Sequence, residues 1–137
     1  MSNLAAPDVL YTASVTMLAV ILYVYMGIRV GQARGKYKVS APAMTGNPDF
    51  ERVVRVQANT LEFMVAFLPS LWLAEIYFGG WIPPALGLVW VIGRIVYMVG
   101  YTAEAGKRSL GFSIQALAAI ALMVLAIVGI VQAFMMA

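Results

Sequence analysis

Charged and amide side chains interrupt an otherwise apolar segment at residues 48–78. Four of them follow the period of a helix: Arg52, Arg55, Asn59 and Glu62. At about 100° per residue they fall within an arc of about 80°, so they form one stripe. Guanidinium groups bind carboxylates, and a carboxylate binds an ammonium group. The stripe is therefore suited to a small ligand that carries charges of both signs.

A second stripe of polar residues occurs in the segment of residues 84–106. Its members recur at helical spacing: Arg94, Tyr97, Tyr101, Glu104 and, if the helix continues that far, Arg108. The short connection between the two segments requires antiparallel neighbouring helices, with both stripes toward the same end. We expect the stripes to face each other across one cleft.

A structural explanation of these charges is also possible. A charge at mid-bilayer costs about 2.5–3.5 kcal/mol, so it needs a partner or a wet site. Glu62 and Arg94 lie at similar depths and could form a structural ion pair. Such a pair needs neither the amide of Asn59 nor the phenols of Tyr97 and Tyr101. These extra polar groups favour a bound zwitterionic ligand.

Composition indicates a membrane protein. Of the 137 residues, 63% are hydrophobic and 11% are charged, and the mean hydropathy is +0.88. This is too little polar surface for a soluble globule. The chain has no cysteine and no histidine, so we expect no metal site. No basic stripe of the kind seen in nucleic-acid-binding proteins occurs, so we expect no nucleic acid partner.

The apolar segments predict an all-α membrane protein with four transmembrane helices in an antiparallel bundle. We expect one domain over residues 1–137, with helices at about 8–33, 48–78, 84–106 and 111–135. The first apolar run is not preceded by a basic region, so we interpret it as a retained helix and not as a cleaved signal peptide.

Three local signals refine these bounds. Asn47, followed by Pro48 and Asp49, is typical of a helix start with asparagine as the cap. Gly79-Gly80, followed closely by two prolines, predicts a very short turn. Pro69 lies inside the second predicted helix, where it can introduce a kink.

Lysine and arginine gather on one side of the predicted bundle. The first connection and its margins carry Arg29, Arg34, Lys36, Lys38 and Arg52, and the third carries Lys107 and Arg108. Residues 79–83 carry none. By the positive-inside rule both basic loops are cytoplasmic, and the two termini lie on the opposite side of the membrane. Arg52, Lys36 and Lys38 also fit the role of interfacial anchors.

Two motifs resemble one known family. Residues 50–63, with the sequence FERVVRVQANTLEF, residues 94–101, with the sequence RIVYMVGY, and Arg108 are similar to the MAPEG superfamily of membrane-associated proteins in eicosanoid and glutathione metabolism. The pattern is most similar to leukotriene-C synthases and to bacterial relatives of microsomal glutathione transferases. The resemblance extends from Arg34 through the final helix.

The resemblance implies a homotrimer of four-helix subunits, with glutathione bound as co-substrate in clefts between neighbouring subunits near the cytoplasmic face. The residues that match the family's glutathione contacts are Arg34, Arg55, Gln57, Asn59, Glu62, Tyr97 and Tyr101. By this resemblance the two arginines pair with the carboxylates of glutathione, and the asparagine and glutamate hold its γ-glutamyl end.

The resemblance also assigns a catalytic residue. Arg108 is expected beside the thiol, as its activator, although with Lys107 it could instead be only a basic anchor. Phe63 departs from the pattern, because leukotriene-C synthases carry a tyrosine there, so one hydroxyl contact is missing. Non-enzymatic members of the superfamily lack the arginine set, and its presence favours catalysis.

The expected activity is that of a membrane glutathione transferase, which joins the glutathione thiolate to lipophilic electrophiles arriving through the bilayer. Such a reaction serves detoxification or eicosanoid-like lipid metabolism. Glutathione-dependent isomerase or peroxidase activity would use the same site. One alternative is a small proton-coupled multidrug transporter that uses Glu62, although a site rich in arginine repels cations. Another is a non-catalytic lipid-binding scaffold of the same fold.

Overall fold

The computed structural model describes residues 4–137, which form helices and their connections. The elements are α1 (Pro7–Tyr37), α2 (Pro48–Tyr77), α3 (Ile82–Ala103), a 3₁₀ turn η1 (Ala105–Arg108) and α4 (Ser109–Met136). Within residues 4–137, four helices are long and apolar enough to cross a membrane, the last of them counted together with η1. The predicted fold class, an all-α membrane protein with four spanning helices, is confirmed.

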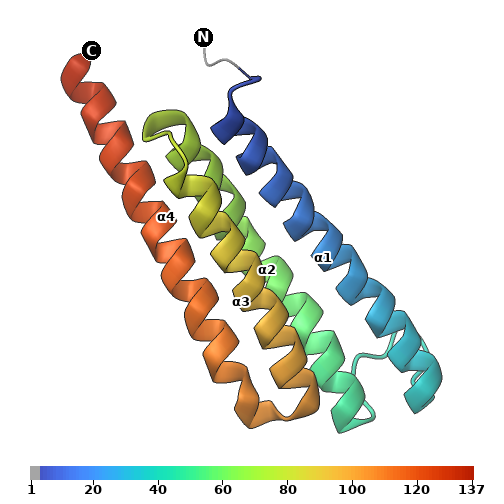
Figure 1. Cartoon of the computed structure of the whole chain (residues 1–137). Helices are drawn as coiled ribbons and strands as arrows, with labels where there is room; N and C mark the ends of the chain where they lie inside the picture. Colours follow the sequence, from blue (N-terminus) through green and yellow to red (C-terminus); the bar gives the residue numbers. More distant parts are fainter. Residues whose placement is uncertain (1–3) are drawn as a thin grey trace.

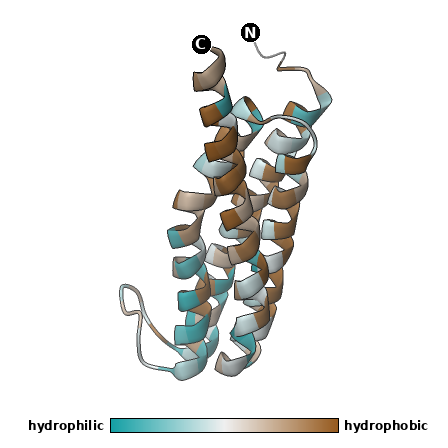
Figure 2. Cartoon of the chain, turned by 90° about the vertical axis from the view of Figure 1, so that its left-hand side faces the viewer, coloured by the Kyte–Doolittle hydropathy of each residue, from teal (hydrophilic) through white to brown (hydrophobic). Residues whose placement is uncertain are grey.

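The helices form an elongated bundle in which α2 and α3 lie between α1 and α4 (Figure 1). The start of α1, the end of α4 and the turn between α2 and α3 lie at one end of the bundle. The loop of residues 38–47 and η1 lie at the other. Figure 2 shows that hydrophilic residues gather toward the end that carries this loop, while most of the remaining length is hydrophobic.

Aromatic and aliphatic side chains fill the centre of the bundle. The rings of Phe67 and Trp90 are stacked, with centroids 3.9 Å apart, and both side chains are buried. Leu71 and Leu122 complete this layer and are fully buried as well. Many large apolar side chains point outward instead, as is expected where lipid is the solvent.

The start of α2 follows its local sequence signal. The side chain of Asn47 accepts hydrogen bonds from the backbone N–H groups of Asp49, at 2.9 Å, and Phe50, at 3.1 Å. These bonds satisfy two of the free donors of the first turn. The prediction of an asparagine cap is confirmed, and α2 then runs through Pro69 to Tyr77 without interruption.

The first helix is longer than predicted. It continues past residue 33 to Tyr37 and ends where Lys38 adopts a left-handed conformation, with φ of 56°. The backbone N–H of Lys38 donates to the carbonyl of Arg34. Basic residues in this last turn are favoured by the helix dipole, which explains why the helix extends into a segment rich in loop-forming residues.

The third helix is shorter than predicted, and this corrects the expected bound of residue 106. It ends at Ala103 because Glu104 adopts an extended conformation, after which η1 reverses the chain. The reversed chain packs on Gly100, where an added Cβ would lie 2.4 Å from the backbone oxygen of Lys107. A residue with a side chain at position 100 would therefore push η1 away.

Close contact between α3 and α4 depends on small residues. A Cβ added at Gly111 would lie 2.1 Å from the backbone nitrogen of Tyr97, and one at Gly93 would lie 2.7 Å from the backbone nitrogen of Gln115. The backbones of the two helices therefore pack directly on each other. This contact brings the first turns of α4 beside the polar stripe of α3.

Candidate functional site

A cleft of about 330 Å³ opens at the end of the bundle that carries η1. Four elements contribute to its walls. The lining residues are Arg55 and Asn59 from α2, Tyr97 and Tyr101 from α3, Arg108 from η1, and Ser109, Phe112 and Ser113 from α4. The cleft thus brings together part of each predicted polar stripe, while the other stripe members do not line it: Arg52, Glu62, Arg94 and Glu104.

A pair of opposite charges lies along one side of this site. Arg55 donates through Nη1 to Oε1 of Glu62 at 3.0 Å and through Nη2 to Oε2 at 3.3 Å. Asn59 donates from Nδ2 to Oε2 of Glu62 at 3.4 Å. Because both charged side chains are about half exposed, they remain accessible to a ligand.

Two tyrosines and an arginine form the part of the cleft nearest to the end of the bundle. The rings of Tyr97 and Tyr101 have centroids 5.5 Å apart. The guanidinium carbon of Arg108 lies 5.6 Å from the ring centroid of Tyr101. Arg108 reaches the cleft from the 3₁₀ turn and not from a continued helix, so its place at the site depends on the chain reversal after Glu104.

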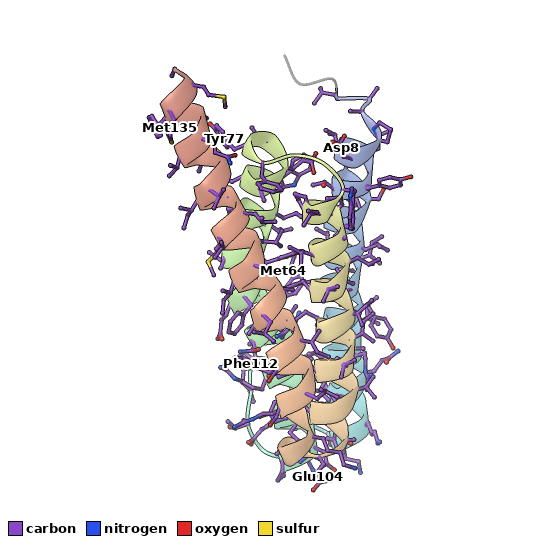
Figure 3. The ribbon with its side chains drawn as sticks, turned by 60° about the vertical axis from the view of Figure 1, so that its left-hand side comes forward. Asp8, Met64, Tyr77, Glu104, Phe112 and Met135 are labelled. Atoms are coloured by element: carbon purple, nitrogen blue, oxygen red, sulfur yellow. The ribbon has the colours of Figure 1, made fainter. Side chains whose placement is uncertain are left out.

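An apolar wall adjoins these polar groups. The rings of Phe63 and Phe112 meet edge to face, with centroids 5.4 Å apart. Figure 3 shows Phe112 in the half of the bundle toward Glu104. Three further lining residues were not predicted from sequence, although their spacing places them on one helical face directly after Arg108: Ser109, Phe112 and Ser113.

Two of the predicted contact residues lie elsewhere in the subunit. Gln57 is two residues from Arg55 and therefore projects from another side of α2, where its side chain contacts Gly27 of α1. Arg34 donates to the backbone oxygen of Ala43 at 2.7 Å and stacks over the ring of Phe50. Neither residue lines the cleft formed by α2, α3, η1 and α4. Glu62 is not among the lining residues either, but it is bonded to Arg55, which lines the cleft.

Arg94 does not pair with Glu62 as the structural explanation supposed. Its Nη2 donates to Oδ1 of Asn59 at 3.1 Å and to Oγ1 of Thr60 at 2.6 Å, whereas Glu62 pairs with Arg55. The guanidinium carbon of Arg94 lies 4.2 Å from the ring centroid of Tyr97. Arg94 therefore lies behind the cleft, in contact with residues that line it.

The chain matches the model of the MAPEG family over residues 12–128. It belongs to this family. A microsomal glutathione S-transferase 2 from Homo sapiens is 42% identical over 123 residues, which cover 90% of this chain and 84% of that protein. A leukotriene C4 synthase from Bos taurus is 38% identical, covering 93% of this chain and 85% of that protein.

A third relative carries no functional description. It is an uncharacterized protein from Synechocystis, 50% identical over 90% of both chains. The family match over residues 12–128 includes parts of all four helices and every residue that lines the cleft of this MAPEG chain. Among residues 4–137 no group of three or more His, Cys, Asp or Glu side chains is placed to hold a metal ion, and the cleft offers guanidinium, phenol, amide and hydroxyl groups instead.

Proposed function

We propose that this MAPEG protein is a membrane-bound glutathione transferase that joins the glutathione thiolate to lipophilic electrophiles. The observation that carries the proposal is the cleft itself, which brings Arg55, Asn59, Tyr97, Tyr101 and Arg108 together from three elements. The similarity to proteins named microsomal glutathione S-transferase 2 and leukotriene C4 synthase supports the same substrate.

The charges at the cleft fit the charges of glutathione. This tripeptide has two carboxylates, one ammonium group and one thiol. Arg55 offers a guanidinium for a carboxylate, and Glu62 offers a carboxylate for the ammonium group. Asn59 provides a further polar contact beside Glu62. Bound in this way, the γ-glutamyl end lies on α2 and the thiol can extend toward Arg108.

The reaction needs a thiolate close to an electrophile. A free thiol has a pKa of about 8.5, and a neighbouring cation lowers it to about 7 or below. Arg108 serves this role because a guanidinium stays charged at working pH. The thiol proton leaves to solvent, the thiolate sulfur forms a bond to the electrophilic carbon, and the leaving group departs with its bonding electrons.

The second substrate is expected to approach along the apolar side of the cleft. Phe63 and Phe112 offer aromatic contact next to the polar groups, and the surrounding helix surfaces are apolar. A lipophilic molecule dissolved in the bilayer can therefore approach without crossing water. Isomerase or peroxidase reactions of glutathione with lipid substrates would use the same arrangement.

A site shared between copies of the chain accounts for the position of Arg34 and Gln57. Both lie on the side of the subunit formed by α1 and α2, away from the cleft. If glutathione contacts them as the family resemblance implies, a second copy must supply them. We therefore propose a homotrimer in which each glutathione lies between two neighbouring subunits.

The proposed orientation follows from the basic residues. Lys36, Lys38 and Lys107 belong to the end of the bundle that carries the loop of residues 38–47 and η1 (Figure 1). The positive-inside rule makes this the cytoplasmic end. The cytosol is also the compartment that holds the glutathione pool, so the cleft would open where its substrate is abundant.

Transport of cationic compounds is a weaker hypothesis. A proton-coupled transporter needs an intramembrane carboxylate that can bind the cation, yet Glu62 is already bonded to Arg55 and is adjoined by Asn59. Arg94 and Arg108 add positive charge to the same region. A scaffold without catalysis would keep the fold and lose the conjugation reaction, so an activity assay separates it from a transferase.

Conjugation of glutathione to 1-chloro-2,4-dinitrobenzene by the purified protein tests the proposal. We expect formation of the thioether above the uncatalysed rate, and loss of this activity in Arg55→Ala. Lys36→Ala is the matched control, because Lys36 is a basic residue of the same end that does not line the cleft. No conjugation by the unmodified protein, together with no binding of glutathione, would reject the proposed function.

A further inference from the structure

A buried guanidinium lies directly behind the proposed glutathione site. Arg94 has no exposed surface and does not line the cleft. It nevertheless contacts two residues that do, since it bonds to Asn59 and lies over the ring of Tyr97. Apart from the electrostatic field of its charge, Arg94 can therefore act on a ligand in the cleft only through these neighbours.

The contact with Arg94 determines which way the amide of Asn59 faces. An asparagine side chain has an acceptor oxygen on one side and a donor nitrogen on the other, while a guanidinium has donors only. Oδ1 of Asn59 must therefore face Arg94, where it accepts a hydrogen bond of 3.1 Å. Nδ2 then faces Glu62 and donates to it. The opposite orientation would place two donors against each other.

The result is a chain of four polar groups that begins in the core and ends at the cleft. Arg94 bonds to Asn59, Asn59 bonds to Glu62, and Glu62 bonds to Arg55. The last two members are the opposite charges proposed to hold glutathione. The orientation of the buried amide thus sets the donor that stands next to the Glu62 carboxylate.

A role limited to holding helices together explains Arg94 less well. Its guanidinium belongs to none of the ion pairs found among residues 4–137. Two of its nitrogens, Nε and Nη1, have no hydrogen-bond partner. Apolar residues of similar volume stabilise a core as well as or better than a buried charge. Burial of a guanidinium with no ion pair and two unbonded nitrogens costs folding free energy. Its presence is better explained by its hydrogen bond to Asn59, which orients the amide.

We propose that Arg94 is a positioning residue for glutathione, which holds the amide of Asn59 with its nitrogen toward Glu62 and so prepares the carboxylate that receives the γ-glutamyl ammonium group. This inference rests on the proposed glutathione site. It assigns Arg94 no contact with glutathione, and it makes the effect of Arg94 dependent on the presence of Asn59.

A double-mutant cycle tests this dependence in the purified full-length protein. Arg94→Met, Asn59→Ala and the double variant are compared with the unmodified protein by calorimetric titration with glutathione and by steady-state conjugation. We expect Arg94→Met to raise Kd and KM for glutathione about tenfold, with kcat at saturating glutathione changed less. Because Arg94 acts through Asn59, the double variant should bind no more weakly than Asn59→Ala alone. Additive losses would overturn the proposal.

Thr60→Val is the matched control for general damage to the core. It removes the other hydrogen bond of Arg94 to a side chain, at 2.6 Å, and leaves Asn59 in place. We expect a lower melting temperature and an unchanged Kd for glutathione. If Thr60→Val weakens glutathione binding as much as Arg94→Met does, the effect of Arg94 is structural and the positioning role is wrong.

A second variant keeps the test decisive if Arg94→Met does not fold. Asn59→Asp retains an oxygen toward Arg94 and replaces the amide nitrogen beside Glu62 by a second oxygen. We expect a folded protein that binds glutathione at least tenfold more weakly, on the order of one charge-assisted bond. Unchanged affinity would overturn the proposal. Absence of binding by the unmodified protein would instead reject the glutathione site itself, and the positioning role with it.

Discussion

Arg55 and Glu62 are joined by two parallel hydrogen bonds although they lie seven positions apart on α2. Nη1 lies 3.0 Å from Oε1, and Nη2 lies 3.3 Å from Oε2. Two helical turns bring the side chains to the same face. Their exposed fractions are 52% and 53%, so solvent screens the pair and it adds little to folding stability. Its importance is that Arg55, which lines the cleft, and Glu62 beside it both keep their charges exposed.

The first prediction concerns Glu62→Gln. We expect Kd for glutathione to rise about tenfold or more, because the ammonium group of the ligand loses a charge-assisted hydrogen bond. The melting temperature without ligand should change little, since the pair with Arg55 is half exposed. Calorimetric titration with glutathione measures the change in Kd. Thermal melting with and without glutathione measures the change in stability.

Arg52→Ala is the control for Glu62→Gln. Arg52 is bonded to Asp49, one turn earlier on α2. It has no hydrogen bond to Glu62 or to the residues bonded to Glu62, which are Arg55 and Asn59. Its loss should leave glutathione affinity nearly unchanged. A result in which Glu62→Gln lowers the melting temperature of the free protein and leaves Kd unchanged would show that Glu62 is a structural residue.

The second prediction is a change of pH dependence in Arg108→Ala. Without the cation, the thiol of bound glutathione should return toward its free pKa of about 8.5. Turnover at pH 7 should fall and should recover as the pH rises toward that value, with glutathione affinity little changed. Initial rates of conjugation between pH 6 and 9 measure this profile.

Lys107→Ala provides the comparison for Arg108→Ala. Lys107 is the adjacent basic residue, it pairs with Glu104 on the surface, and it does not line the cleft. We expect its loss to leave the pH profile unchanged. If Arg108→Ala has the turnover of the unmodified protein at pH 6.5, the assignment of Arg108 as thiol activator is wrong and it serves as an anchor.

The third prediction concerns the orientation of the chain in the membrane. Single cysteines at Ser40 and Trp81 are both expected to be accessible, because both residues are exposed and they lie at opposite ends of the bundle. Trp81 is preferable to Gly80, which has a φ of 77° that disfavours a side chain.

A membrane-impermeant maleimide should label Ser40→Cys from the cytoplasmic side and Trp81→Cys from the other. The chain has no native cysteine, so the unmodified protein is an unreactive control. Labelling of both positions from one side would contradict the proposed topology.

The fourth prediction is a glutathione site shared between subunits of a trimer. Amine-reactive cross-linking in detergent should give a ladder that ends at three chains. Co-expression of Arg34→Ala with Arg55→Ala should restore part of the activity that each variant lacks alone, because some mixed sites then receive both arginines from different subunits. Cross-linking that stops at dimers, or no restoration on co-expression, would be evidence for a site within one subunit.

The fifth prediction concerns the close contact of α3 with α4. Gly111→Ala should destabilise the protein by about 1–3 kcal/mol, because the new Cβ meets the backbone of Tyr97. Gly31→Ala is the matched control, since nothing lies within 4 Å of a Cβ added there and alanine favours a helix by about 0.5–1 kcal/mol. Thermal melting compares the two. Equal melting temperatures would show that α3 and α4 can separate at no cost.

Local features of the chain could be predicted from sequence because their causes lie within a few residues. Helix-length apolar segments predict four spanning helices, and Asn47 predicts the start of α2. The helical period also places Arg55, Asn59 and Glu62 on one stripe. None of these features requires knowledge of which helix packs beside which.

The partners of the polar groups were decided only by the tertiary structure. Arg94 bonds to Asn59 and Thr60, and not to Glu62, because the rotation of α3 against α2 depends on side-chain packing over their whole length. Arg108 reaches the cleft because the chain reverses over Gly100 and α4 packs on α3 at Gly111. Such contacts join residues far apart in sequence. Their geometry depends on how the surfaces of two helices pack together, and the period of a single helix does not predict that packing.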